Sequence, residues 1–200
     1  MPAGTKPQGD GRAIIFSAPS GAGKTTVVRH LISNPDLALG FSVSATTRAP
    51  RTGETDGQDY HFLTIEEFTS RLADHAFVEH EEVYDGLSYG TLCSEVERLW
   101  AEGRTPLFDV DVVGGQTLKS VFGDSALSIF VMPPSLEALE SRLRGRGTED
   151  EASVQKLLGK AAQELKAAQA FDVQLVNDDL EKAFAEATQL VENFLQSDPV

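Results

Sequence analysis

The stretch that decides the fold is Ser17-Ala18-Pro19-Ser20-Gly21-Ala22-Gly23-Lys24-Thr25-Thr26. It follows a short apolar run, residues 13–16, and it opens a helical pattern over residues 26–32. A Gly-rich turn between a strand and a helix is typical of a P-loop, whose backbone N–H groups surround a phosphate. The start of the helix adds partial positive charge at the same point. We therefore expect the chain to bind a nucleoside triphosphate.

Two side chains of this stretch carry the expected chemistry. Lys24 can neutralise the β- and γ-phosphates, and the Thr25 hydroxyl can ligate the Mg²⁺ that accompanies the triphosphate. Ala18 stands where the usual pattern, G-x-x-x-x-G-K-[ST], has its first glycine. The alternative is an ordinary Gly-rich turn, but Gly23 and the two residues after it lie at the strand–helix junction that a phosphate site needs. The loop alone does not indicate which molecule accepts the phosphate.

The composition sets limits on the rest of the chain. Two hundred residues with 40% hydrophobic content suit one globular domain. No apolar run approaches about 18 residues, so we expect no membrane-spanning helix and no membrane partner. Cys93 is the only cysteine, which excludes an internal disulfide and favours a reducing cytoplasm. Residues 1–11 are rich in Gly, Pro and polar side chains, and we expect a flexible tail there.

The charge balance is strongly acidic, with 17 Lys and Arg against 31 Asp and Glu and a net charge of −14. This balance disfavours a nucleic-acid partner, because binding a polyanion needs a basic face. An acidic protein that binds anionic nucleotides must gather its Arg and Lys locally, so the Arg positions are informative. Two explanations can account for the acidity: it keeps the protein soluble, or it suits life in a high-salt cytoplasm.

Apolar strands alternate with amphipathic helices along the chain. This pattern predicts an α/β fold, with a P-loop NTPase-type three-layer core around a largely parallel sheet. Residues 106–111 read as a buried strand that ends in Asp109 and Asp111, the layout of a Walker-B element beside the P-loop. Thr64 and Glu67 predict a capping box at the start of a helix over 65–73. Another helix is expected near residues 114–122.

Further landmarks follow the P-loop in a fixed order. They are residues 42–54 (SVSATTRAPRTGE), 89–91 (YGT), 109–111 (DVD), 142–147 (RLRGRG) and 176–178 (VND). Together with the P-loop and its Ala18, they resemble the landmarks of the guanylate kinase family, over nearly the whole chain from residue 13 to 195. Six segments in register leave little room for chance.

The resemblance implies a cytoplasmic guanylate kinase that converts MgATP and GMP reversibly to ADP and GDP, in guanine nucleotide synthesis and recycling. It implies one domain over residues 12–196. The core would comprise residues 12–40, 93–141 and 158–196, with a GMP-binding region over 41–92 and a lid over 142–157. Tolerance of dGMP stays open, as does the choice between a monomer and a homodimer.

On the ATP side, the resemblance implies that Arg142 and Arg146 counter the charge on the transferring phosphoryl group, where electrostatics supplies most of the catalysis. Asn177 would lie near the adenine. Asp109 would act on Mg²⁺ through water, and Asp111 would orient the P-loop lysine or the acceptor. The implied ATP-binding residues are Ala18, Pro19, Ser20, Gly21, Ala22, Gly23, Lys24, Thr25, Arg142, Arg146 and Asn177.

For the acceptor phosphate, the resemblance implies a grip by Arg48 and Arg51, helped by the hydroxyls of Tyr60 and Tyr89. Arg offers paired donors that fit phosphate oxygens. The implied catalytic residues are Lys24, Arg48, Arg142, Arg146 and Asp109. The alternative for the two tyrosines is an ordinary place in a sheet.

For the acceptor base, the resemblance implies that Glu79 accepts hydrogen bonds from guanine N1–H and the 2-amino group, while Ser44 and Thr91 donate to O6. A carboxylate facing those two donors rejects adenine, because it would stay buried without partners. The alternative is a solvent-facing strand residue, which is what we expect of Glu81 and Glu82.

Two departures from the family pattern stand out. The family has Lys-Arg in the helix after the lid, whereas here Lys156 is followed by Leu157. Lys156 or Lys160 could substitute, although a point charge is not a bidentate fork. Restoring the arginine by Leu157→Arg is expected to raise turnover. The second departure is one extra residue in the segment 83–89. It lengthens the loop before Tyr89 and so bears on the phosphate contact expected of that residue.

Two other functional classes compete with this reading. A guanylate-kinase-like interaction domain that binds peptides would have a degraded P-loop, but Lys24 and Thr25 are both present. A P-loop kinase of a phosphorylated sugar would lack the full guanine pocket. Measuring which acceptors saturate the protein separates the three.

Overall fold

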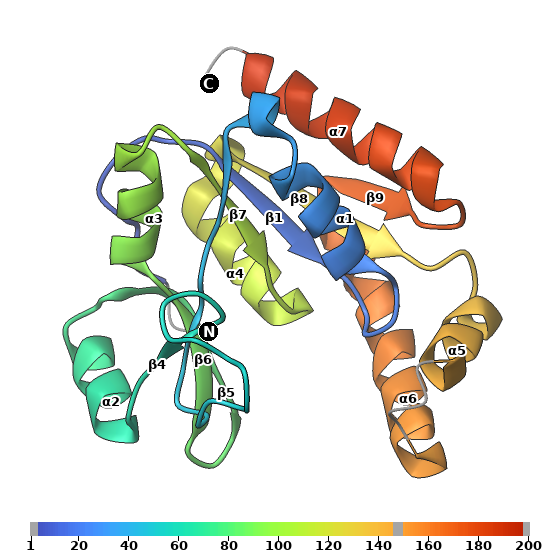
Figure 1. The fold of residues 1–200 in the computed structure, drawn as a ribbon, viewed down its shortest axis with the longest axis horizontal. Helices are drawn as coiled ribbons and strands as arrows, with labels where there is room; N and C mark the ends of the chain where they lie inside the picture. Colours follow the sequence, from blue (N-terminus) through green and yellow to red (C-terminus); the bar gives the residue numbers. More distant parts are fainter. Residues whose placement is uncertain (1–3, 146–149, 198–200) are drawn as a thin grey trace.

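The structure, a computed structural model, describes residues 4–145 and 150–197. Its centre is a five-stranded parallel sheet in the order β2-β7-β1-β8-β9 (Figure 1). The strands are β1 (Ala13–Ser17), β2 (Leu39–Phe41), β7 (Thr105–Asp109), β8 (Ala126–Met132) and β9 (Val173–Val176). All five residues of β1 are buried, as expected for a strand covered by helices on both faces.

Helices cover both faces of this sheet. Ile14 and Phe16 of β1 pack in one apolar cluster with residues of α1 (Lys24–Ile32) and α7 (Leu180–Gln196). Ala13 and Ile15 belong to a second cluster, which includes residues of α3 (Cys93–Ala101) and α4 (Val112–Phe122). The predicted three-layer α/β core is therefore confirmed.

A smaller sheet lies beside the core, in the order β4-β3-β6-β5 (lower left in Figure 1). Its strands are β3 (Ala45–Thr46), β4 (His61–Phe62), β5 (Phe77–Tyr84) and β6 (Leu87–Leu92). The helix α2 (Ile65–Ala73) packs on it through Phe68. The predicted capping box is confirmed, because Thr64 accepts from the Glu67 N–H and the Glu67 side chain accepts from the Thr64 N–H.

Two helices project on the opposite side of the core (lower right in Figure 1). They are α5 (Leu136–Gly145) and α6 (Glu151–Ala167), which share an apolar cluster and an Arg144 pairing with Glu140 and Glu151. The expected lid, residues 142–157, falls on the end of α5, on residues outside the described range and on the start of α6. Arg146 lies outside the described residues. Among the described residues there are also three 3₁₀ turns: η1 (Pro35–Leu37), η2 (Gly123–Ser125) and η3 (Ala168–Ala170).

The described part of the N-terminal segment lies against the core and the smaller sheet. The Thr5 N–H donates to the Phe77 carbonyl at 3.2 Å, and the Gln8 N–H donates to Glu97 Oε1 at 2.8 Å. Pro7 is buried. The composition of residues 1–11 gave no indication of these contacts. Within the described residues, the structure contains no helix with the length and apolar character needed to span a membrane.

Candidate active site

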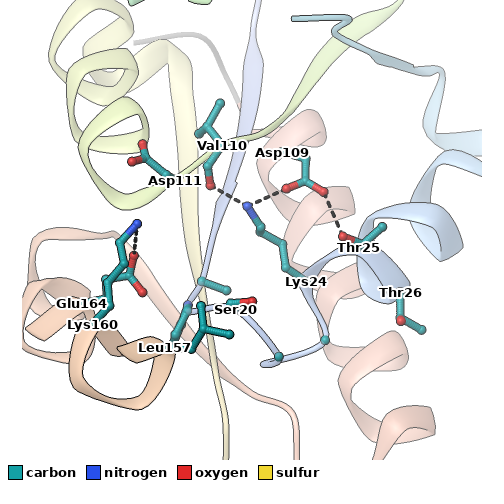
Figure 2. A pocket seen from close by; sticks show the side chains of 14 residues that line it. Ser20, Lys24, Thr25, Thr26, Asp109, Val110, Asp111, Leu157, Lys160 and Glu164 are labelled. Carbon is teal, nitrogen blue, oxygen red and sulfur yellow. Dashed lines mark hydrogen bonds and ion pairs between the residues drawn. The ribbon is translucent and has the colours of Figure 1, made fainter. Parts of the chain in front are cut away.

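The loop between β1 and α1 curves around a cavity of about 390 Å³, which we call the loop cavity (Figure 2). Gly21 and Gly23 have φ values of 91° and 96°, a backbone region that other residues rarely adopt. A Cβ added at Gly23 would lie 2.2 Å from Asn177 Nδ2, so the loop has no room for a side chain there. The P-loop residues that line the cavity are Ala18, Pro19, Ser20, Gly21, Gly23, Lys24, Thr25 and Thr26.

The end of β7 meets this loop at Lys24. Lys24 Nζ lies 2.5 Å from Asp109 Oδ1 and donates to the Val110 carbonyl, also at 2.5 Å. The Thr25 hydroxyl donates to Asp109 Oδ2 at 3.3 Å (Figure 2). These contacts form because β1 and β7 are adjacent parallel strands, whose carboxyl ends lie at the same edge of the sheet. The arrangement places the Lys24 ammonium at the loop cavity, together with two oxygen groups that can ligate a metal, the Thr25 hydroxyl and the Asp109 carboxylate.

Asp111 caps α4 by accepting the Gly114 N–H at 2.7 Å. The helix expected near residues 114–122 is confirmed as α4, which this cap starts slightly earlier, at Val112. Lys24 is oriented by Asp109 and Val110.

Two side chains from later in the chain support the backbone of the P-loop. Asn177 is 5% exposed, and its Nδ2 donates to the Ala22 carbonyl at 2.8 Å. Arg142 Nη2 donates to the Asn177 carbonyl at 2.8 Å, and Arg142 Nη1 donates to the Ala22 carbonyl at 3.4 Å. Ala22 is itself fully buried. Asn177 and Arg142 thus brace the loop backbone, and neither is among the described residues that line the loop cavity.

A second cavity, of about 250 Å³, lies between the end of β7 and the smaller sheet; we call it the strand cavity. Glu79 lines it and is only 7% exposed, and its Oε1 accepts the Thr91 hydroxyl at 2.7 Å. Burial raises the pKa of Glu79 to about 7, and the Asp111 charge adds to this while the Thr91 hydrogen bond opposes it. Ser44, Tyr60 and other residues complete the lining: Glu81, Val83, Tyr89, Gly90, Asp109, Val110, Asp111 and Lys160.

Glu81 lines the same cavity, so the expectation that it faces solvent is wrong. Side chains alternate along a strand, and residues 79 and 81 of β5 therefore share one face. A hydrogen bond with Asp111 raises the pKa of Glu81 to about 7, and burial and the Asp111 charge act in the same direction. Glu82 is exposed, as expected.

Arg48 is held next to the strand cavity by a two-point pairing with Glu54, with Nη1 and Nη2 each 2.9 Å from a carboxylate oxygen. The guanidinium also lies over the Tyr60 ring, 5.3 Å from its centroid. Glu54 raises the pKa of Arg48 above its usual range, and Arg48 lowers that of Glu54 to about 2. Arg48 Nε is buried and has no hydrogen-bond partner among the described residues. This N–H is therefore a buried donor left unpaired in the described part of the folded chain.

The two remaining predicted residues of this region differ in position. The Tyr89 ring packs edge-on against Tyr60, with centroids 5.9 Å apart. Arg51 is exposed, and its N–H donates to Glu54 Oε2 at 2.7 Å. Its side chain would have to turn inward to reach a ligand in the strand cavity.

A family model described as "Guanylate kinase" matches residues 10–194 of the chain. The chain belongs to the guanylate kinase family. Its guanylate kinase relatives include those of Porphyromonas gingivalis, which is 47% identical over 184 residues (92% of this chain and 98% of that protein), and Salinibacter ruber, which is 49% identical over 189 residues (94% and 99%). The solved guanylate kinase from Anaplasma phagocytophilum superposes with a TM-score of 0.73 at 30% identity, covering 94% of this chain and 87% of that one.

The resemblance inferred from the sequence is thus confirmed, and with it the enzyme class. As a guanylate kinase, the chain is a nucleoside monophosphate kinase, a transferase that moves a phosphoryl group from ATP to GMP.

Two residues of this guanylate kinase site were missing from the sequence-based set, and a third, Lys160, was named there only as a substitute for the arginine expected at position 157. Glu54 closes the segment 42–54 and holds Arg48, and its position in that segment was the available signal. Glu81 could have been found from its spacing of two from Glu79. Lys160 lines both cavities, but only its proximity to them in the fold shows this.

Proposed function

We propose that this guanylate kinase binds ATP in the loop cavity and GMP in the strand cavity, and transfers the phosphoryl group where the two cavities meet. The observation that carries this proposal is their shared wall. Residues 109–111 at the end of β7 line both cavities, one of which contains the P-loop and the other the buried Glu79. A triphosphate and an acceptor phosphate can therefore approach each other beside Asp109.

For guanine, Glu79 is proposed to accept from N1–H and the 2-amino group. The Thr91 hydroxyl can donate one hydrogen bond, and in this structure it donates that bond to Glu79. We therefore assign Thr91 the role of holding the Glu79 carboxylate in place, and Ser44, which lines the cavity, the role of donor to guanine O6. Thr91 can reach O6 only if it releases that hydrogen bond.

For the GMP phosphate, the unpaired Nε–H of Arg48 is the proposed main donor. Glu54 accepts one hydrogen bond from each of the other two guanidinium nitrogens and fixes the direction of the group. Burial raises the pKa of Tyr60, so its phenol stays protonated and can donate to a phosphate oxygen. Tyr89 and Arg51 are proposed to add contacts when GMP binds.

The residues present also suit Mg²⁺. The Thr25 hydroxyl and the Asp109 carboxylate are hard oxygen donors at the edge of the loop cavity. Among the described residues there is no group of three or more His, Cys, Asp or Glu that could hold a metal by itself. Mg²⁺ is commonly held by one or two protein oxygens together with substrate phosphates. We propose that Thr25 and, through water, Asp109 hold this ion, which when bound neutralises charge on the phosphates.

Catalysis then depends on positioning and charge. Lys24 is proposed to bind the β- and γ-phosphates, and Arg142 to keep the P-loop in its binding shape. Arg146 and Asn177 keep their proposed roles near the phosphoryl group and the adenine. The acceptor is an anionic phosphate oxygen, so the reaction needs no general base. The region 41–92 and the lid 142–157 are proposed to close over the substrates and exclude water.

The same proposal includes a cytoplasmic location, a monomeric or homodimeric state, the use of MgATP and the absence of a nucleic-acid partner. The support for a reducing compartment is that Cys93 is the only cysteine, so the chain cannot form an internal disulfide.

The test of the function is ADP production from MgATP with GMP, AMP, UMP or no acceptor, each at low and high KCl. We expect turnover with GMP and little with the other acceptors. Saturable GMP binding without ADP production would instead favour an interaction domain. Activity confined to high KCl would support the high-salt reading of the acidity.

The KM for GMP is expected to rise about tenfold between pH 8 and pH 6, because guanine needs the charged form of Glu79 and its pKa is about 7 in the free protein. The sign follows from burial: protonation increases as the pH falls through 7, and the protonated acid presents one acceptor fewer. The measurement is the KM for GMP, determined together with kcat, from pH 5.5 to 8.5. The GMP phosphate also titrates near pH 6, so the control is the Glu79→Gln variant. An equal pH dependence in both proteins would contradict the prediction.

A further inference from the structure

Lys160 lies where the loop cavity and the strand cavity meet. The residues shared by the two linings are Asp109, Val110 and Asp111 at the end of β7, and Lys160 on α6. Figure 2 shows its side chain extending from α6 toward the side of the cavity where Asp111 lies. The ammonium group is thus placed across from the end of β7, in the space through which a phosphoryl group would pass.

The lining of the strand cavity is rich in carboxylates. It contains four carboxylates, those of Glu79, Glu81, Asp109 and Asp111. Of the described residues that line it, Lys160 is the one with a cationic side chain. Asp109 already pairs with Lys24. Glu79 and Glu81 are only partly ionised near pH 7, so the repulsion that an entering phosphate meets is moderate, and a nearby positive charge offsets it.

Lys160 pairs with a neighbour on α6 but stays exposed to solvent. Its Nζ lies 3.4 Å from Glu164 Oε1, and the Lys160 side chain is 63% exposed whereas that of Glu164 is 13% exposed. The ammonium end of this pair is open to solvent, so it can turn toward a phosphate oxygen, although Glu164 is itself largely buried.

The neighbouring positions on α6 are occupied differently. Leu157 faces the loop cavity, but it also packs against the apolar cluster between α5 and α6 that includes Leu139 and Leu143. Lys156 is exposed, and in the described part of the chain it lines neither cavity. Spacings of three and four residues place Leu157, Lys160 and Glu164 on one helix face. Of the two lysines, only Lys160 is positioned to act on the substrates.

We propose that Lys160 is a catalytic residue whose ammonium group binds the phosphoryl oxygens between ATP and GMP during transfer. The proposal rests on the function proposed above. In that reaction the bond from the γ-phosphorus to the bridging oxygen of ADP breaks, and a bond from the same phosphorus to a GMP phosphate oxygen forms. Lys160 gives up no proton in this step and acts through its charge.

The first experiment compares Lys160→Met with Lys156→Met, the same change at an exposed site on the same helix. Removing a charge that acts in the transition state is expected to lower kcat about 10- to 100-fold with each KM within about threefold, since kcat and KM separate such a loss from lost substrate binding. Lys156→Met should keep kcat within about twofold, and Lys160→Arg should retain most of it. Equal kcat values for the two Met variants, or a loss confined to KM, would overturn the proposal. Thermal unfolding of each variant shows whether it is folded.

A double-mutant comparison tests the site more sharply. Leu157→Arg places a cation on the same helix face, so it is expected to raise kcat more in the Lys160→Met background than in the parent. An equal gain in both backgrounds would mean that the two positions do not act on the same charge, against the proposal.

A binding experiment separates the failure of this proposal from failure of the proposed function. The probe is an adenosine and a guanosine joined by five phosphates, which spans both cavities. Lys160→Met is expected to weaken its binding about tenfold or more by calorimetry, while ATP and GMP alone change less than about threefold. If the parent protein makes no ADP with GMP, the function fails, and this comparison still decides on Lys160. Unchanged affinity for the linked nucleotide would overturn it.

Discussion

Replacing Lys24 by methionine is expected to lower kcat for transfer to GMP about 10³-fold, the effect of losing a preorganised charge at a reacting phosphate. Lys24 Nζ is fixed in the loop cavity by Asp109 and the Val110 carbonyl, each at 2.5 Å. Methionine keeps the length of the side chain and removes its charge. The loss should therefore appear in kcat and in the KM for ATP, with the KM for GMP within about threefold, because GMP is proposed to bind in the other cavity.

The control for Lys24 is its conservative variant together with a folding measurement. Lys24→Arg keeps the charge but changes its shape, and it should retain more activity than methionine. Lys24 is 17% exposed at the edge of a cavity, so thermal unfolding should change little. A fall in kcat of less than tenfold in a folded Lys24→Met protein would contradict the role assigned to the P-loop.

The second large effect is expected from Glu79→Gln, which should lower kcat/KM for GMP about 10²- to 10³-fold. The amide offers one acceptor oxygen and places N–H donors against the N1–H and 2-amino donors of guanine. Adenine has an acceptor at N1, so the preference for GMP over AMP should narrow. The measurement is kcat/KM for both nucleotides. Glu82→Gln, an exposed change on the same strand, is the control and should leave both values unchanged.

Loss of folding would not explain this result. Burial raises the pKa of Glu79 from its ordinary value of 4.5 to about 7. The stability associated with the protonated acid is present below pH 4.5 and is lost as the pH rises through 7. At pH 8 the parent therefore bears the cost of a buried charge, and the glutamine variant does not. Its thermal unfolding midpoint at pH 8 should equal or exceed that of the parent; a retained GMP preference would count against the guanine contact.

The sequence alone determined the elements whose geometry is local. The P-loop follows from Gly21 and Gly23, which supply the left-handed backbone, and from the helix that begins directly after them. The cap at Thr64 depends on residues three apart. The place of Asp109 next to Lys24 also follows, because parallel strands bring their carboxyl ends together.

Only the tertiary structure decided how distant charges share one space. The contact between Glu81 and Asp111 joins the smaller sheet to the core, and Asn177 reaches the P-loop from the far end of the chain. Lys160 lines both cavities because α6 is placed opposite β7. Local spacing gives the face of a strand or helix on which a residue lies, but which other face it meets depends on the packing of whole elements. That packing determines where the carboxylates gather, and where a cation can offset them.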